Sequence, residues 1–179
     1  MADFKTYEKR LQSWEGSGYS NKPSDKGGPT TSGITLDTFQ LFYGADKTIE
    51  DLKKLTYEQW YHIMKGGFWD KCKADEIKNQ SVAEIFVDWT INSGWAMIKR
   101  VQKIVGVKED GIVGPRTITA INSCNQQALH YRIKKERALW YFKCVDHNMD
   151  LDVRAAILPT NIANINGWLR RLGDFLYKK

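Results

Sequence analysis

The sequence has little of several features that define other protein classes. It contains three cysteines and four prolines among 179 residues, and no apolar run is long enough to cross a bilayer. Three scattered cysteines do not make a disulfide framework, although one bridge stays open, and they fit synthesis in a reducing compartment. The first residues include no apolar segment, so we expect no signal peptide. With ordinary apolar and charged fractions, the composition excludes disordered, collagen-like and membrane-spanning chains.

Sequence motifs for bound cofactors are also missing. The chain has no GxGxxG, GxxxxGK[ST], HExxH or GxSxG pattern. Cys144 and His147 form the one closely spaced Cys/His pair, and a zinc site would need a second pair at matching spacing. We therefore expect no cofactor and no metal.

Aromatic and basic residues are plentiful by comparison. Seven Trp, eight Tyr and seven Phe occur, and 27 Lys and Arg outnumber 21 Asp and Glu, which gives a net charge of +6. Aromatic faces stack on sugars and bases, and cations pair with phosphate or carboxylate, so the composition favours an anionic polymer or a carbohydrate as partner. The positive excess lies in residues 90–179, which carry +8, whereas residues 1–89 carry −2.

Apolar spacing predicts a mainly α fold. Phe4, Tyr7, Leu11 and Trp14 recur at helical intervals, which predicts a helix over residues 3–15. The glycine-rich stretch that follows predicts a structured loop or a small irregular hairpin. Further helices are expected at 35–44, 49–54, 57–66, 82–92, 95–105, 115–122, 125–145 and 161–176, and Phe142 is expected on an apolar face of the 125–145 helix. Capping patterns begin at Thr48, Thr56 and Ser81.

The glycine-rich loop carries residues suited to glycoside hydrolysis. Glu15 ends the first predicted helix and Asp25 lies ten residues later, so two carboxyl groups can face each other across the loop. Trp14 and Tyr19 could form an apolar wall that raises the pKa of the acid, and a threonine hydroxyl could hold the attacking water. The alternative is a solvated Glu15 and a structural turn at Asp25.

The segment from Glu15 to Thr35 resembles the signature of glycoside hydrolase family 108. This chain has E-G-S-G-Y-S-N-K-P-S-D-K-G-G-P-T followed by G-I-T, and the family pattern is roughly E-G-G-Y-x-N-x-P-x-D-x-G-G-x-T-x-x-G-I-T. A second block, with D-W-T-I-N-S-G, V-Q and D-G-I-V-G-P-R-T over residues 88–117, resembles the predicted peptidoglycan-binding domain usually attached to that family. On this basis we expect a catalytic lobe at 1–85 and a peptidoglycan-binding lobe at 86–179, packed as one unit.

The resemblance implies a lysozyme-like helical fold and a phage-endolysin type of activity. Family members are bacterial peptidoglycan N-acetylmuramidases, some described as secretion activators, which hydrolyse the β-1,4 bond between N-acetylmuramic acid and N-acetylglucosamine. By position in the motif, Glu15 would be the general acid and Asp25 the second carboxylate, with Thr30 or Thr31 as the catalytic threonine. The expected substrate contacts are Tyr19, Asn21, Asn92, Trp95 and Gln102, and structural hydrogen bonding is an equal alternative for Asn92 and Gln102.

One departure keeps a second hypothesis open. The chain has Glu-Gly-Ser-Gly-Tyr where the family pattern has Glu-Gly-Gly-Tyr, and the additional residue could shift Asp25 relative to Glu15. An error of about 1 Å can cost on the order of a hundredfold in rate. A non-catalytic peptidoglycan-binding or secretion-assisting protein on the same scaffold is therefore the alternative.

The expected partners follow from these hypotheses. We expect a monomer that binds peptidoglycan glycan strands, without insertion into a membrane. It would act at the cell wall or in the periplasm after release or export by an unknown route. A nucleic-acid-binding protein, suggested by the basic second half, is less favoured, because charge at helical spacing usually marks a solvated face and no nucleic-acid motif accompanies it.

Overall fold

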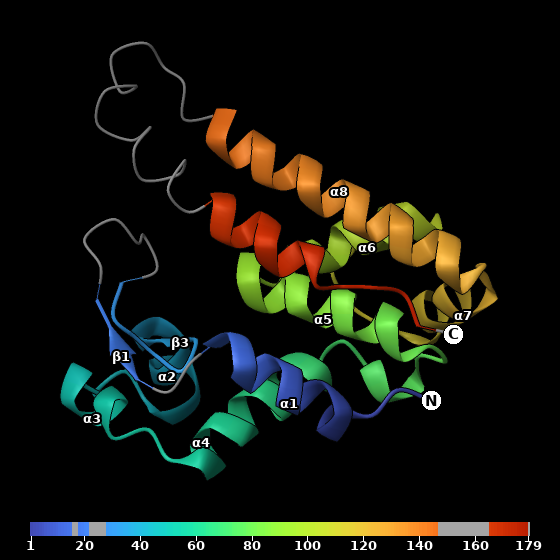
Figure 1. The fold of residues 1–179 in the computed structure, drawn as a ribbon. Coiled ribbons are helices and arrows are strands. Elements are labelled where there is room, and N and C mark those ends of the chain that lie inside the picture. Colours follow the sequence, from blue (N-terminus) through green and yellow to red (C-terminus); the bar gives the residue numbers. More distant parts are fainter. Residues whose placement is uncertain (16–17, 22–27, 147–164, 179) are drawn as a thin grey trace. The chain divides into compact units, whose positions relative to one another are not determined.

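A computed structural model describes residues 1–15, 18–21, 28–146 and 165–178 of the chain (Figure 1). Contacts between residues divide it into two compact units. One unit is Phe4–Asp70, here called the hairpin unit. The other joins Met1–Asp3 to Lys71–Lys179 and is here called the helical unit. The prediction of a mainly helical fold with a small hairpin after the first helix is confirmed.

The hairpin unit begins with a helix that leads into a small antiparallel sheet. Its strands pair in the order β1-β2-β3. The elements in chain order are α1 (Phe4–Glu15), β1 (Tyr19–Ser20), β2 (Thr30–Thr31), β3 (Ile34–Thr35), α2 (Leu36–Tyr43), α3 (Ile49–Lys53), α4 (Tyr57–Tyr61) and the π-helix η1 (His62–Trp69).

An aromatic cluster holds α1 in the hairpin unit. Phe4, Tyr7 and Leu11 are fully buried, as their helical spacing predicts. The Tyr7 ring stacks on the Trp69 ring with centroids 5.7 Å apart, and the Phe4 ring meets the same indole edge-on at 5.5 Å. Burial of side chains of this size stabilises the fold by about 1.5–3 kcal/mol each. The first turns of α1 are thereby anchored, and its last turn leads towards the hairpin.

Short helices in this unit begin where their capping residues predict. The Thr48 side chain accepts from the backbone N–H of Asp51, and the Asp51 carboxylate accepts from the backbone N–H of Thr48. Thr56 and Gln59 form the same reciprocal pair at the start of α4. Both predicted capping boxes are confirmed. They could be predicted from the sequence because the contacts that form them span only three residues.

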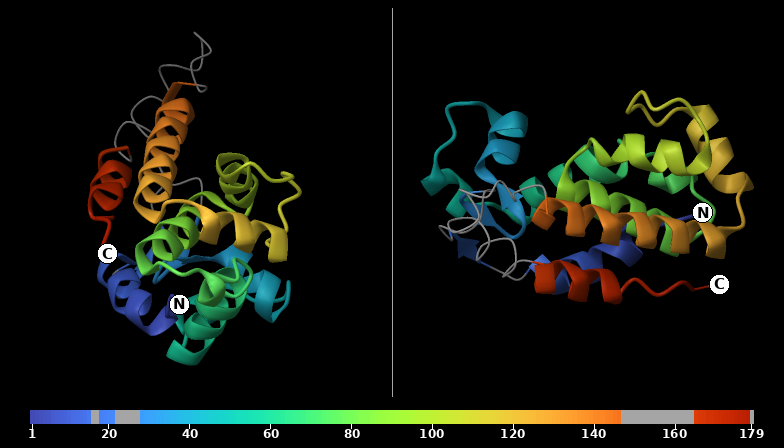
Figure 2. Two further views of the ribbon diagram at one scale, coloured as in Figure 1. Left: turned by 90° about the vertical axis from the view of Figure 1, so that its right-hand side faces the viewer. Right: turned by 90° about the horizontal axis from the view of Figure 1, so that it is seen from above.

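The helical unit is built around a long buried helix. Its elements are the 3₁₀ helix η2 (Ala74–Glu76), α5 (Gln80–Ser93), α6 (Met97–Val105), α7 (Pro115–Ser123) and α8 (Gln126–Asp146), and residues 165–173 are also helical. Helix α5 packs against α6 and α8, which also pack against each other, and most of α5 is buried. Both views of Figure 2 show residues 165–173 alongside α8, where the rings of Tyr141 and Trp168 lie 5.3 Å apart.

Two expectations for the helical unit need correction. Helix α5 is capped by Asn79, whose side chain accepts from the N–H of Val82, and not by Ser81. The Ser81 hydroxyl lies inside the helix, where it accepts from the backbone N–H of Lys178. Phe142, expected on an apolar face of α8, is more than half exposed. No helix in the described ranges is both long and apolar enough to cross a membrane.

Candidate functional site

The hairpin after α1 brings several predicted site residues together. Tyr19 on β1 pairs with Thr31 on β2, and Thr31 pairs in turn with Ile34 on β3. Ser32 and Gly33, which connect β2 to β3, both have positive φ, at 48° and 78°. Two such residues match the right-handed twist of a tight hairpin turn. The indole N–H of Trp60 donates to the Ser32 carbonyl at 3.0 Å, so a buried aromatic side chain holds the turn in place.

The two candidate threonines differ in what their hydroxyls do. The Thr30 hydroxyl donates to the Gly28 carbonyl at 3.1 Å, so it stabilises the loop before β2. The Thr31 side chain is 8% exposed, and its Oγ1 is buried without a hydrogen-bond partner among the described residues. An unpaired buried hydroxyl costs about 1–3 kcal/mol, and buried polar groups are nearly always paired. Thr31 therefore has the hydroxyl that is available to another molecule.

The remaining loop residues are placed less completely. Glu15 is the last residue of α1, but its side chain and the whole of Asp25 lie outside the described residues. Tyr19 is 39% exposed, and the Lys53 ammonium lies 4.9 Å from its ring centroid. Asn21 directly follows β1 and is exposed. The structure thus groups the phenol ring, the amide and the two threonines on one hairpin that follows Glu15.

Gln102, from the second motif, holds a turn of the helical unit. It is 1% exposed, and its amide nitrogen donates to the Asp110 carboxylate at 2.8 Å and to the Ile112 carbonyl at 3.0 Å. Its amide oxygen accepts from the backbone N–H of Gly111 at 2.8 Å. The N–H of Ile112, and then the Gln102 amide, lower the pKa of Asp110. The Gln102 amide therefore makes structural hydrogen bonds that hold the D-G-I-V-G-P segment.

Asn92 and Trp95 lie near the end of α5 and also have protein partners. The Asn92 side-chain oxygen accepts from the Tyr141 hydroxyl at 2.8 Å, which is a structural hydrogen bond between α5 and α8. Trp95 is half-buried, and the Lys71 ammonium lies 3.8 Å from its ring centroid. A cation on an aromatic face stabilises this arrangement by about 0.5–2 kcal/mol. Contacts of these residues with a glycan stay predictions.

A buried ion network crosses the helical unit and was missed by sequence reasoning. Asp88 and Arg137 are both completely buried, and the guanidinium donates to the carboxylate at 2.6 Å. Arg171 donates to the other carboxylate oxygen at 2.5 Å. Burial alone would raise the pKa of Asp88, but the Arg171 and Arg137 charges outweigh it and lower the pKa to about 2. One signal for this network is present in the sequence, because Arg137 lies four residues from both Ile133 and Tyr141, which are buried.

Neither unit offers an evident metal site among its described residues. No group of three or more His, Cys, Asp or Glu side chains in the described ranges is arranged to hold an ion.

Comparison with protein families defines the class of the chain: a glycoside hydrolase with an attached peptidoglycan domain. Residues 9–94 match the glycosyl hydrolase 108 model, and residues 96–173 match the model described as a predicted peptidoglycan domain. The chain thus carries a glycosyl hydrolase 108 domain, and the predicted peptidoglycan domain follows directly after it. The two matches meet next to Gly94, the residue that ends α5. The expected division into lobes at 85/86 stays a prediction, and α5 runs through it.

A solved structure is similar over nearly the whole chain. It is titled "Structure of Brucella abortus SagA" and superimposes with a TM-score of 0.79 at 27% sequence identity. The match covers 97% of this chain and 92% of the other. A comparison with curated proteins gives no match. The similarity thus extends through both family domains in the same order.

Proposed function

We propose that this chain is an N-acetylmuramidase that hydrolyses the β-1,4 bond between N-acetylmuramic acid and N-acetylglucosamine in peptidoglycan. The observation that carries the proposal is the glycosyl hydrolase 108 match over residues 9–94, which includes the second half of α1 with its last residue Glu15 and the entire hairpin. The attached peptidoglycan domain supports the same substrate and an action at the cell wall.

Glu15 is the general acid in this proposal. A carboxylic acid protonates the oxygen of the leaving sugar while positive charge develops on the other ring. The C-terminal end of a helix carries partial negative charge, and this favours the protonated form of a carboxyl group there. Asp25 is the second carboxylate, which acts as base, nucleophile or charge stabiliser.

Thr31, rather than Thr30, is the threonine that we assign to catalysis. The Thr30 hydroxyl already donates to the Gly28 carbonyl, whereas the Thr31 Oγ1 is buried and unpaired. A buried hydroxyl without a protein partner can bind and orient a water molecule at little further cost. Tyr19, directly across the β1–β2 pair from Thr31, presents a partly exposed aromatic face to a sugar ring. Asn21 adds an exposed amide next to it.

The decisive experiment measures hydrolysis by Glu15→Gln. Purified peptidoglycan is incubated with the full chain, and new reducing ends are quantified and identified by mass spectrometry. Loss of a general acid should lower the rate by about 10²–10⁴-fold, with new reducing ends on N-acetylmuramic acid in the wild type. Glu8→Gln, on the same helix, is the matched control and should remain active. Hydrolysis by Glu15→Gln at the wild-type rate would contradict the assignment.

A pair of variants separates the two threonines. Thr31→Val should lower activity by about tenfold or more through loss of one hydroxyl contact. Its stability should change little, because the lost hydroxyl has no partner to leave unpaired. Thr30→Val should lose its bond to the Gly28 carbonyl and keep most of its activity. Equal activity losses in the two variants would contradict the assignment of Thr31. A loss only in Thr30→Val would assign the role to Thr30.

A non-catalytic wall-binding protein is the second candidate. It is favoured by the additional residue between Glu15 and Tyr19, which lengthens the connection between the acid and the hairpin. That candidate predicts sedimentation of the wild-type chain with peptidoglycan and no release of reducing ends. The assay on the wild type therefore separates the two functions before any variant is made.

A further inference from the structure

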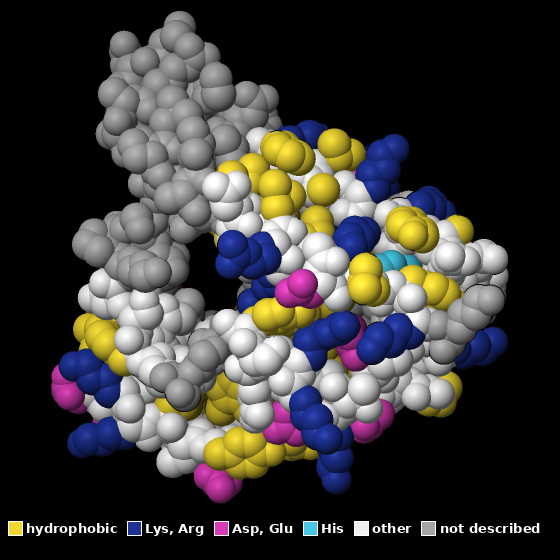
Figure 3. Space-filling view, viewed as in Figure 1, with side chains coloured by type: hydrophobic (Ala, Val, Ile, Leu, Met, Phe, Trp, Pro, Cys, Tyr) yellow, Lys and Arg dark blue, Asp and Glu magenta, His cyan; other side chains and the backbone are white. Residues whose placement is uncertain are grey.

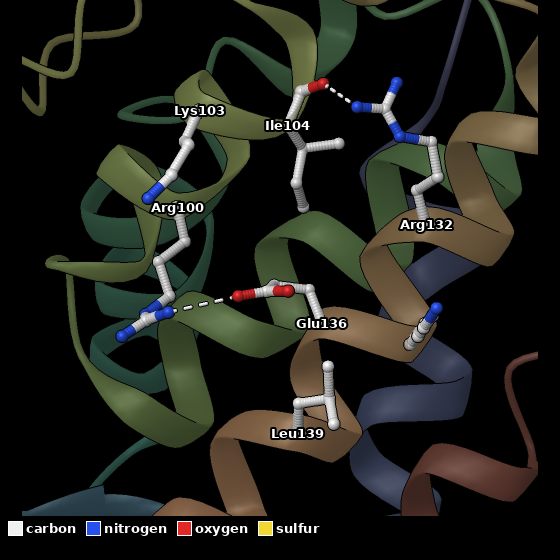
Figure 4. A pocket seen from close by; sticks show the side chains of 7 residues that line it. Arg100, Lys103, Ile104, Arg132, Glu136 and Leu139 are labelled. Atoms are coloured by element: carbon white, nitrogen blue, oxygen red, sulfur yellow. Dashed lines mark hydrogen bonds and ion pairs between the residues drawn. The ribbon is translucent and has the colours of Figure 1, made fainter.

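A cationic pocket lies in the helical unit between α6 and α8. It encloses about 410 Å³ and is lined by Arg100, Lys103, Ile104, Arg132, Lys135, Glu136 and Leu139. The lining residues are spaced three or four apart on each helix, so they form one stripe on α6 and a facing stripe on α8. Figure 4 shows the two sets of side chains meeting across the space between the helices. Its size falls in the usual range for small-ligand sites.

The charges of this pocket are not balanced by the protein. Four of the lining residues are cationic and one is acidic. Arg100 donates to the Glu136 carboxylate at 3.2 Å, and Arg132 donates to the Ile104 carbonyl. Lys103 and Lys135 are exposed, and their ammonium groups make no hydrogen bond or ion pair with the described residues. Like charges gathered in one concave space repel each other, and a bound anion would relieve that repulsion.

The pocket also has an apolar component. Ile104 lines it from α6 and Leu139 from α8, and Leu139 is 46% exposed. The Trp140 ring lies next to it, with the Arg100 guanidinium carbon 4.4 Å from the ring centroid, so the indole supports the arginine from outside the pocket. Hydrophobic and basic side chains lie next to each other over α8 in Figure 3 as well. The site therefore suits a ligand that has both carboxylates and short aliphatic groups.

We propose that this pocket binds the peptide stems of peptidoglycan through their carboxylates. Such stems are short peptides with alanine methyl groups and free carboxylates, and both groups have complementary side chains here. Lys103 and Lys135 would pair with stem carboxylates, while Ile104 and Leu139 contact the aliphatic part. This inference rests on the proposed function, and it adds that the attached domain recognises the peptide of the substrate, not its sugars.

Nucleic acid is the competing anion and fits the pocket less well. Nucleic-acid sites follow the phosphate backbone along an extended basic groove, often with exposed aromatic rings for stacking. Here the cations converge on one small concavity that also contains Glu136 and two aliphatic side chains. The Glu136 carboxylate would repel the successive phosphates of a polyanion, and the two aliphatic side chains offer them no partner.

The test uses calorimetric titration of the full chain with two soluble probes. One probe is a disaccharide muropeptide that carries its stem, and the other is the same disaccharide without peptide. The wild type should bind the muropeptide more tightly than the bare disaccharide, and less tightly at higher salt because the contacts are ionic. Lys103→Glu with Lys135→Glu should weaken muropeptide binding by about tenfold or more and leave disaccharide binding unchanged.

A control variant distinguishes the pocket from general charge. Lys108→Glu with Arg116→Glu changes the net charge equally, at two exposed residues of the same unit that do not line the pocket. This control should bind the muropeptide like the wild type. An equal loss in both double variants would show that overall charge is responsible and would overturn the proposal. Unchanged muropeptide binding in the Lys103 and Lys135 variant would overturn it as well.

One substitution should strengthen binding. Glu136→Gln removes the single carboxylate of the pocket and releases Arg100 from its ion pair, so affinity for the muropeptide should rise by about two- to fivefold. A residue with only a structural role would not produce a gain, and weaker binding by a folded Glu136→Gln variant would count against the pocket. If DNA binding is lost in the Lys103 and Lys135 variant while muropeptide binding persists, the site is for nucleic acid and the proposal fails.

The outcomes also separate this inference from the proposed function. Muropeptide binding that depends on the pocket, together with a wild type that releases no reducing ends, would remove the muramidase and keep the stem site. Hydrolysis that depends on Glu15, without any preference for the stem-bearing probe, would keep the muramidase and remove the stem site.

Discussion

Substitution of Asp88 by Asn should destabilise the helical unit severely. The variant keeps the shape of the side chain but removes the negative charge that pairs with Arg137, a residue with no exposed surface. The Arg137 Nη1 already has no hydrogen-bond partner in the described part of the chain, so the guanidinium depends on this carboxylate for charge compensation. Removing one member of a buried ion pair usually costs about 3–5 kcal/mol. We expect a loss of that size in the free energy of unfolding at pH 7, measured by chemical denaturation.

The pH dependence makes the same prediction more specific. The Arg171 and Arg137 charges overcome the effect of burial and lower the pKa of Asp88 from 3.8 to about 2 in the folded chain. The folded state therefore gains stability from the ionised carboxylate above pH 4 and loses it as the pH falls towards 2. The difference between the two pKa values corresponds to about 2 kcal/mol. The gap in stability between wild type and Asp88→Asn should shrink by about this amount between pH 5 and pH 2.

Two further variants test the reasoning behind this prediction. Glu109→Gln removes an exposed carboxylate of the same unit and should change the stability by less than about 0.5 kcal/mol. The double variant Asp88→Asn with Arg137→Met should recover part of the loss, because it also removes the fully buried Arg137 charge and leaves only the partly exposed Arg171 without its carboxylate. A loss below about 1 kcal/mol in Asp88→Asn, or a stability gap that does not change with pH, would refute the account.

Three other changes test separate contacts. Gly67→Ala should destabilise the chain by about 1–3 kcal/mol, because the new Cβ would lie 2.3 Å from the Phe42 ring. At Gly66 the nearest atom would be at an ordinary 3.5 Å, so Gly66→Ala should cost much less. Thermal denaturation compares the two variants. Gln102→Leu should cost about 1–3 kcal/mol, because it removes the buried amide that bonds to Asp110, Gly111 and Ile112 in the following turn. Burial raises the pKa of Cys72 to about 12, so this thiol should react with a thiol reagent at pH 8 only after denaturant is added, and the other two cysteines should react first.

Local patterns in the sequence predicted most of the helical elements. The capping boxes at Thr48 and Thr56 and the proline at the start of α7 depend on contacts within one helical turn, so they can be read without a tertiary structure. The start of α5 was misplaced because Asn79 and Ser81 are both good capping residues. Which of the two residues caps the helix depends on Lys178, which is 97 residues from Ser81 and donates its backbone N–H to the hydroxyl of that serine.

The candidate site shows the same division. The order of Glu15, the glycine-rich loop and the threonines is a property of the sequence, and it was sufficient to indicate the family. The difference between Thr30 and Thr31 was not accessible, because it depends on the pairing of β1 with β2 and on a backbone carbonyl that accepts from only one of them. The pocket between α6 and α8 likewise requires two helical stripes, separated along the chain, to face each other.

The sequence by itself determined the helical class, the hairpin after the first helix and the family, because helix periodicity, caps and a contiguous motif are local properties. The tertiary structure decided which polar groups are paired. Asp88 meets Arg137 and Arg171 across 49 and 83 residues, and those partners account for the burial of a charge that composition assigns to the surface. Hydrogen bonds and ion pairs of this kind depend on distances of about 3 Å between distant segments, and only the folded chain brings those segments together.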